Sequence, residues 1–259
     1  QYIFPAMGGW FVPYLYNVVD GIVVGQGGGS AALGAVNIGV PFITFAVAVA
    51  AMFPMGGGTV VAIRMGREDR EGANHAFMTA FLLTLLASLL LTLIGMAFSR
   101  QIVDLSGGRT LSHTKRDKAA DYLVYYCAFS VPMLMSTCLS VFVRNDGSPT
   151  LSFVGMCVGA GANIFLDWLF IFPMKMGVIG AAIASGLGQV FSVAVLLSHF
   201  VRKRGSLRFQ RFPVSGALVG KICKRGVPEA ASQLTTPVTA LCYNLMLAKL
   251  VGDIGVSTF

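Results

Sequence analysis

Four polar side chains lie inside stretches of sequence that are otherwise apolar. Asn163 and Asp167 are four residues apart in the run Gly161–Phe172, and Tyr16 and Asp20 are four residues apart near the start of the chain. Residues with this spacing share one face of a helix. If the two faces meet, two carboxylates, an amide and a phenol converge on one pocket. Two carboxylates in a low-dielectric pocket cannot easily both be ionised, so such a pair can bind and release a proton or a small cation.

The alternative role for these carboxylates is structural. Each could cap a broken helix or pair with a basic side chain, because a charge deep in a bilayer costs about 2.5–3.5 kcal/mol on insertion scales. Apart from Lys224 and Arg225 at the start of the seventh predicted helix, Lys249 is the only lysine or arginine within the predicted apolar spans. Partners for an ion pair are therefore few, which favours the ion-binding interpretation.

Composition predicts an all-α polytopic membrane protein. The chain has 259 residues, of which 55% are hydrophobic and 12% are charged, and its mean hydropathy is +0.74. Soluble domains carry about 25% charged residues. Several uncharged runs reach the roughly 20 residues that cross a bilayer as a helix, and Phe77–Phe98 lacks the alternation of a β-barrel strand. The net charge of +8 does not indicate nucleic-acid binding, because no arginine-aromatic interleaving accompanies it.

Seven helices follow from the apolar runs. They are expected at Tyr2–Val24, Ala31–Ile63, Phe77–Phe98, Tyr122–Val143, Leu151–Phe172, Val178–Phe200 and Ile222–Val251. The second has breaks at Pro41, Pro54 and Gly56–Gly58, and the fourth contains Pro132. The sequence Arg144–Pro149 predicts a tight turn. The loops after the second, fourth and sixth helices, together with Lys224 and Arg225 at the start of the seventh, hold twelve of the nineteen lysines and arginines, against six on the other side. The positive-inside rule therefore predicts a cytoplasmic chain start.

An internal repeat organises these helices. Six of fifteen positions match between Tyr16–Ser30 and Tyr243–Ser257. The seventh helix would then begin a second, parallel copy of the first six. We expect a six-helix amino-terminal lobe at 1–200, a basic cytoplasmic linker at 201–221 and the first helix of a truncated second lobe at 222–259. Because the chain begins with Gln1, we also expect a fragment without its natural start.

Other candidate groups receive structural interpretations. His75, His113 and His199 lie in predicted loops or at helix ends without metal-ligand spacing, and solvated structural roles are expected for them. The five cysteines have no CxxC spacing and are expected to be small buried hydrophobes. No Ser-His, Cys-His or zinc-type cluster lies in the predicted helices, so an enzyme is not predicted.

Six motifs together give the chain a resemblance to a known family. They are YNVVDGIVVGQG, LGAVNIGVP, RNDGSP, NIFLDWLFIF, GVIGAAIASGLGQ and RGVPEAASQ, which occur in this order and cover almost the whole chain. They resemble the multidrug and toxic compound extrusion (MATE) family. The resemblance implies two six-helix lobes, no cofactor, and export of organic cations or drugs in exchange for H⁺ or Na⁺.

The resemblance also implies roles for particular residues. Its amino-lobe coupling site, for a proton or Na⁺, corresponds here to Asp20, Asn163, Asp167 and Ser185, with Tyr16 one turn before the first aspartate. Pro5 matches a proline linked to bending of the first helix, and Pro13 is a second candidate for that bend. Thr236 stands where some members carry a carboxy-lobe glutamate, which puts that form of site in doubt.

The leading hypothesis is thus an ion-coupled exporter of amphipathic, cationic compounds in a bacterial-type inner membrane. Its partners would be the transported compound, membrane lipid and the carboxy-terminal lobe of the same protein. A flippase for lipid or polysaccharide precursors in the same superfamily is the alternative, although it would need basic groups in its cavity, which are nearly absent. A truncated product without transport activity is the other alternative.

Overall fold

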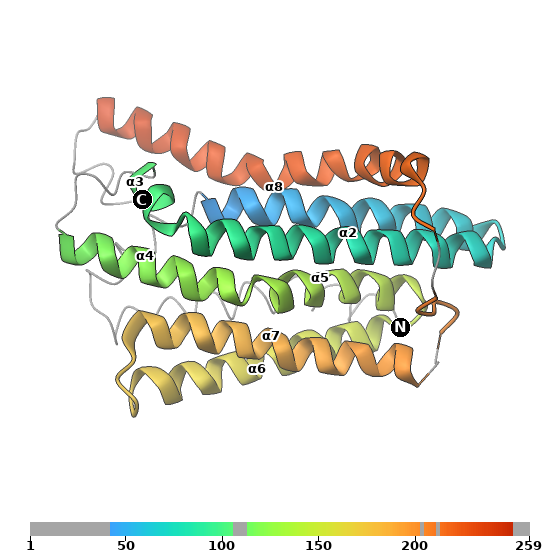
Figure 1. Cartoon of the computed structure of the whole chain (residues 1–259), viewed down its shortest axis with the longest axis horizontal. Helices are drawn as coiled ribbons and strands as arrows, with labels where there is room; N and C mark the ends of the chain where they lie inside the picture. The colour runs from blue at the N-terminus through green and yellow to red at the C-terminus, as the bar shows by residue number, and fades with distance from the viewer. Residues whose placement is uncertain (1–41, 106–112, 203–204, 211–212, 251–259) are drawn as a thin grey trace.

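The computed structural model describes residues 42–105, 113–202, 205–210 and 213–250, and Figure 1 shows them as an elongated bundle of helices that run along its long axis. The first predicted helix lies outside the described residues. So do four of the predicted site residues, Tyr16, Asp20, Pro5 and Pro13.

The helices follow the apolar runs closely. After the helix Phe42–Gly66, drawn in blue in Figure 1, come α2 Arg70–Ala97, α3 Ser99–Leu105, α4 His113–Ala128, α5 Ser130–Asn145, α6 Pro149–Ile171, α7 Gly177–Val201 and α8 Gly216–Leu250. Within the described ranges, four helices are long and apolar enough to cross a membrane, or five if the α4–α5 pair counts as one span. The prediction of an all-α polytopic membrane protein is confirmed.

The predicted helix Tyr122–Val143, with Pro132 inside it, is bent. The structure divides it at Phe129 into α4 and α5, whose apolar parts meet at an angle of 45°. Pro132 accounts for the bend, because it has no N–H to donate and its ring clashes with the carbonyl group four residues earlier. Next to the break, the Thr92 hydroxyl of α2 lies 3.1 Å from the Cys127 carbonyl oxygen.

Glycines in the helix Phe42–Gly66 allow a close crossing with α8. The sequence analysis predicted breaks in the helix at these glycines. The helix continues through Gly56–Gly58. A Cβ atom added to Gly56 would collide with the Ile222 carbonyl oxygen, and one added to Gly226 would collide with the Met52 carbonyl oxygen. The two backbones therefore touch, and glycine is required on both sides of the contact.

The main core lies near the end of the bundle where α2 begins. Phe77 is fully buried, with its ring stacked on Phe200 at 5.2 Å and edge-on to Phe142 at 4.9 Å. The same core takes in three residues from beyond α7, Leu207 in the segment after that helix and Leu218 and Ile222 in α8. The chain that follows α7 thus contributes apolar side chains to the packing of the preceding helices.

Candidate functional site

Among helices α2 to α8, α6 and α7 form the most extensive pair, and glycines let them approach closely. A Cβ atom added to Gly188 would lie 2.7 Å from the Gly159 carbonyl oxygen and 2.9 Å from the Asn163 Cβ atom. Both distances are too short for a real side chain. Small residues at this contact therefore bring the polar face of α6 directly against α7.

Asn163 makes a side-chain hydrogen bond across this contact. Its Nδ2 atom donates to Ser185 Oγ on α7 at 3.2 Å. The Asn163 side chain is buried, and its Oδ1 atom accepts no hydrogen bond from the residues that the structure describes. The amide thus has one polar atom engaged with α7, while its oxygen remains able to accept a proton donor or to coordinate a cation.

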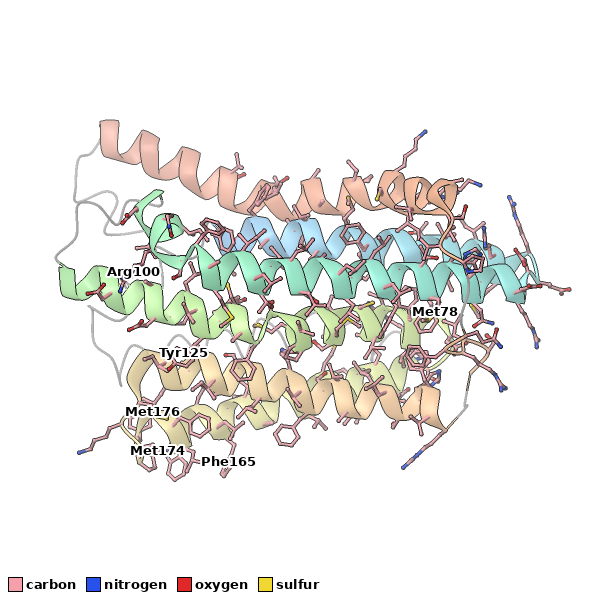
Figure 2. The ribbon with its side chains drawn as sticks, in the orientation of Figure 1. Met78, Arg100, Tyr125, Phe165, Met174 and Met176 are labelled. Carbon is pink, nitrogen blue, oxygen red and sulfur yellow. The ribbon has the colours of Figure 1, made fainter. Side chains whose placement is uncertain are left out.

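Asp167 lies one turn further along α6 and is only 1% exposed. The opposite side of the helix is apolar and exposed at Phe165 and Trp168, and Figure 2 shows Phe165 pointing away from the bundle. A helix with a lipid-facing apolar side and an inward polar side explains why Asn163 and Asp167 interrupt an apolar run.

The structure brings together those predicted site residues that it describes. Asn163 and Ser185 are in contact, and Asp167 is buried on the same side of α6 as Asn163. The described ranges contain no group of three His, Cys, Asp or Glu side chains that could hold a metal ion. The amide and carboxylate oxygens of Asn163 and Asp167 are nevertheless suitable ligands for a hard cation.

A second polar contact joins α7 to α5, and the sequence analysis missed it. Ser136 Oγ donates to Gln189 Oε1 at 2.5 Å, and Gln189 lies one turn after Ser185 on α7. The one local indication of this contact in the sequence is that Gln189 is a polar residue within an apolar helix. Its partner is 53 residues away in the sequence, so spacing alone could not identify it.

A third polar cluster lies at the end of the bundle, where the expectation for His199 is wrong. His199 is buried rather than solvated, and its Nε2 atom lies 2.9 Å from Asp146 Oδ2. Asp146 Oδ1 also accepts hydrogen bonds from the Ser206 backbone N–H at 2.9 Å and from the Ser206 hydroxyl at 2.8 Å. The predicted turn Arg144–Pro149 is present. In addition, its acidic residue, Asp146, accepts hydrogen bonds that hold the segment after α7 against the turn.

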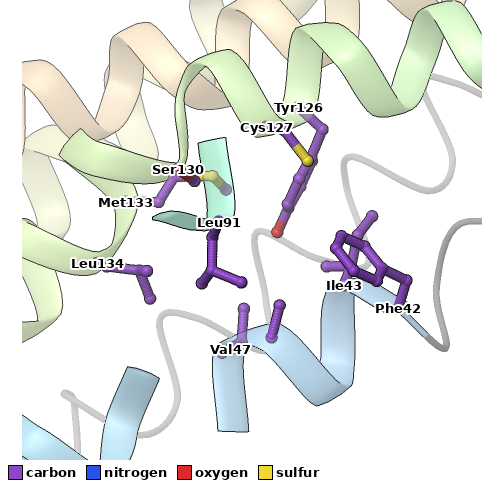
Figure 3. A pocket seen from close by; sticks show the side chains of 10 residues that line it. Phe42, Ile43, Val47, Leu91, Tyr126, Cys127, Ser130, Met133 and Leu134 are labelled. Atoms are coloured by element: carbon purple, nitrogen blue, oxygen red, sulfur yellow. The ribbon is translucent and has the colours of Figure 1, made fainter. Parts of the chain in front are cut away.

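An apolar hollow lies beside the α4–α5 bend (Figure 3). Its lining comes from the helix Phe42–Gly66, α2, α4 and α5, and consists of Phe42, Ile43, Ala46, Val47, Leu91, Tyr126, Cys127, Ser130, Met133 and Leu134. None of these residues belongs to α6 or α7. The hollow is therefore separate from the contact between Asn163 and Ser185.

Comparison with known proteins gives a family match. A model of the MatE family matches residues 5–169. The multidrug export protein MepA of Staphylococcus haemolyticus (strain JCSC1435) is 26% identical over 248 residues, which cover 94% of this chain and 54% of that protein. MepA of Staphylococcus aureus (strain MRSA252) is 23% identical over 259 residues, covering 98% of this chain and 56% of that protein. The chain spans about half the length of these relatives.

Solved structures agree with this match along nearly the whole chain. The crystal structure of a MATE mutant has a TM-score of 0.90 at 26% identity and covers 99% of this chain and 57% of that one. A MOP superfamily transporter from Pyrococcus furiosus, whose binding pocket has reverse polarity, has a TM-score of 0.88 at 26% identity over 98% of this chain and 56% of that one. The chain therefore belongs to the MatE family, as a homologue of multidrug exporters that corresponds to their amino-terminal portion.

Proposed function

We propose that this chain is the amino-terminal lobe of a secondary antiporter that exports amphipathic, cationic compounds in exchange for H⁺ or Na⁺. The observation that carries the proposal is the burial of Asn163 and Asp167 on the inner side of α6, with Asn163 bonded to Ser185. A carboxylate held at bilayer depth among helices is costly, and such residues are typical of ion pathways and coupling sites. The family membership supports the same reading.

In this proposal Asp167 takes up and releases the coupling ion, together with Asp20 and Tyr16 of the first helix. Asn163 and Ser185 position the carboxylate and supply neutral oxygen ligands. Ion binding would bias the first helix, through Pro5 or Pro13, between two shapes, because a ligand shifts an equilibrium by its differential affinity for the two states. The second lobe would supply the opposite wall of the transport pathway.

The proposed location is a bacterial inner membrane with the chain start in the cytoplasm. The end of the bundle that carries Arg64, Arg67, Arg144 and Arg202 would then face the cytoplasm, consistent with the positive-inside rule.

The test uses the complete gene product that contains residues 1–259, reconstituted in vesicles with a pH or Na⁺ gradient. Asp167→Asn and Asp20→Asn should each abolish gradient-driven export of a fluorescent organic cation while expression is maintained. Asp121→Asn changes an exposed aspartate of α4 in the same way and should leave export unchanged. Export by both site variants at the wild-type rate, across a range of pH and Na⁺, would show that the carboxylates are structural.

A further inference from the structure

The α7 helix makes polar contacts with two different neighbours within one turn. Ser185 Oγ accepts the hydrogen bond from Asn163 on α6 at 3.2 Å, and Gln189 Oε1 accepts the hydrogen bond from Ser136 on α5. Ser185 and Gln189 are four residues apart and therefore lie on the same side of α7. Both contacts depend on the same rotation of this helix about its axis.

Close packing fixes that rotation on both sides of α7. On the α6 side, Gly188 leaves no room for a Cβ atom next to Asn163. On the other side, a Cβ atom added to Gly186 would collide with the ring of Phe129, the residue at the α4–α5 break. A small rotation of α7 would therefore disturb its contacts with both α5 and α6, since packed interfaces do not deform continuously.

The Ser136 hydroxyl has two acceptors within reach but only one proton to donate. Its Oγ atom also lies 2.9 Å from the Met133 carbonyl oxygen, one turn earlier on α5. Met133 lines the apolar hollow beside the bend. The hydroxyl can thus bond to α7 or to its own helix, next to the residue that borders the hollow.

We propose that Gln189 is a positioning residue that couples the ion site on α6 to α5 and, through Met133, to the apolar hollow. The inference rests on the function proposed for Asp167. When Ser136 bonds to Gln189, α7 is held in the rotation that places Ser185 against Asn163 and completes the ion site. When Ser136 bonds to its own helix instead, α7 is no longer held in that rotation, and the affinity of the site for the coupling ion falls.

The test is a double-mutant cycle in the complete gene product that contains this chain. Gln189→Leu and Ser136→Ala each remove one partner of the bond between α5 and α7. Each should lower the affinity for the coupling ion about fivefold, the effect of one net hydrogen bond. The double variant should lose no more than the worse single variant, because both changes remove the same interaction.

Ion affinity is read from the Na⁺ or pH dependence of the fluorescence of Trp168, which adjoins Asp167 on α6, in a background in which Trp10 and any other tryptophan are replaced by phenylalanine. The matched control for serine is Ser198→Ala, whose hydroxyl donates to the Val195 carbonyl oxygen of its own helix. The matched control for glutamine is Gln233→Leu, whose side chain bonds to Glu229 within α8. Neither control should change the ion affinity, and the thermal unfolding temperature is measured for every variant to separate a loss of fold from a loss of positioning.

The outcomes separate this inference from the proposed function. If Asp167→Asn abolishes export and ion binding but Gln189→Leu and Ser136→Ala leave the ion affinity unchanged, Gln189 is not a positioning residue. Additive losses in the double variant would likewise overturn the coupling between Gln189 and Ser136. If Asp167→Asn has no effect on export or ion binding, the proposed function itself fails.

Discussion

His199 Nε2 lies 2.9 Å from Asp146 Oδ2, and both side chains are 1% exposed. The pair joins the end of α7 to the turn between α5 and α6. Asp146 also accepts hydrogen bonds from the Ser206 backbone N–H, the Ser206 hydroxyl and the Leu207 backbone N–H. One buried carboxylate therefore satisfies donors from two separate segments of the chain.

Removal of the Asp146 carboxylate should destabilise the protein strongly. In Asp146→Ala, the donors of His199, Ser206 and Leu207 lose their acceptor in a buried site, which should cost about 3 kcal/mol. The thermal unfolding temperature of the purified protein measures the loss. Asp117→Ala removes an exposed carboxylate and should leave that temperature unchanged. Equal temperatures for the two variants would contradict the role given to Asp146.

The segment 205–210 should resist hydrogen exchange although it has no regular secondary structure. The Arg208 backbone N–H donates to Asn74 Oδ1 at 2.7 Å, and the amides of Ser206 and Leu207 donate to Asp146. Exchange measured by mass spectrometry should show slow exchange for these amides. Asn74→Ala should accelerate exchange at Arg208 and leave Ser206 protected. Fast exchange throughout the segment in the wild-type protein would show that these hydrogen bonds to Asp146 and Asn74 do not hold the segment in place.

The crossing between α8 and the helix Phe42–Gly66 predicts different effects for two glycines of α8. Gly226→Ala should cost about 2 kcal/mol, because the new methyl group forces the two backbones apart at Met52. Gly220→Ala meets no atom within 4 Å, and it should stabilise the helix by up to about 1 kcal/mol. Both effects are measured by thermal unfolding, and a neutral Gly226→Ala would mean that the crossing is loose.

A similar pair of glycines in α6 and α7 tests the geometry of the ion site. Gly188→Ala should push α6 away from α7 and break the bond between Asn163 and Ser185, which lowers the affinity for the coupling ion. Gly161→Ala lies on α6 only two residues before Asn163, but a Cβ atom there meets no atom within 4 Å. It should leave ion binding, followed by Trp168 fluorescence, unchanged. Equal ion affinities for the two variants would contradict the close-packing argument.

The spans and the inward side of α6 could be predicted because they depend on local sequence. Apolar runs of about 20 residues are long enough to cross a bilayer, and two polar residues four apart must share a helix face. Asn163 and Asp167 are accordingly buried. Ser185 came from the family resemblance, because nothing in its own sequence context distinguishes it from the other serines of α7.

The features that the sequence analysis missed depend on contacts between distant residues. Pro132 was visible within the fourth predicted helix, but a proline alone does not fix the angle of 45° at which α4 and α5 meet. The segment after α7 is basic and polar, which is typical of a solvated loop. Its hydrogen bonds to Asn74 and Asp146 join residues that are 134 and 60 positions apart in the sequence. A local sequence pattern cannot predict such pairs.

The contribution of Leu207, Leu218 and Ile222 to the main core bears on the order of events during synthesis. A nascent chain that has inserted every span through α7 still lacks these three residues, because they leave the ribosome later. Until they arrive, the apolar residues around Phe77 and Phe200 have one side uncovered at the end of the bundle. Insertion of the spans through α7 and completion of the core are therefore separate steps, and the second waits for the translation of the segment after α7 and the start of α8.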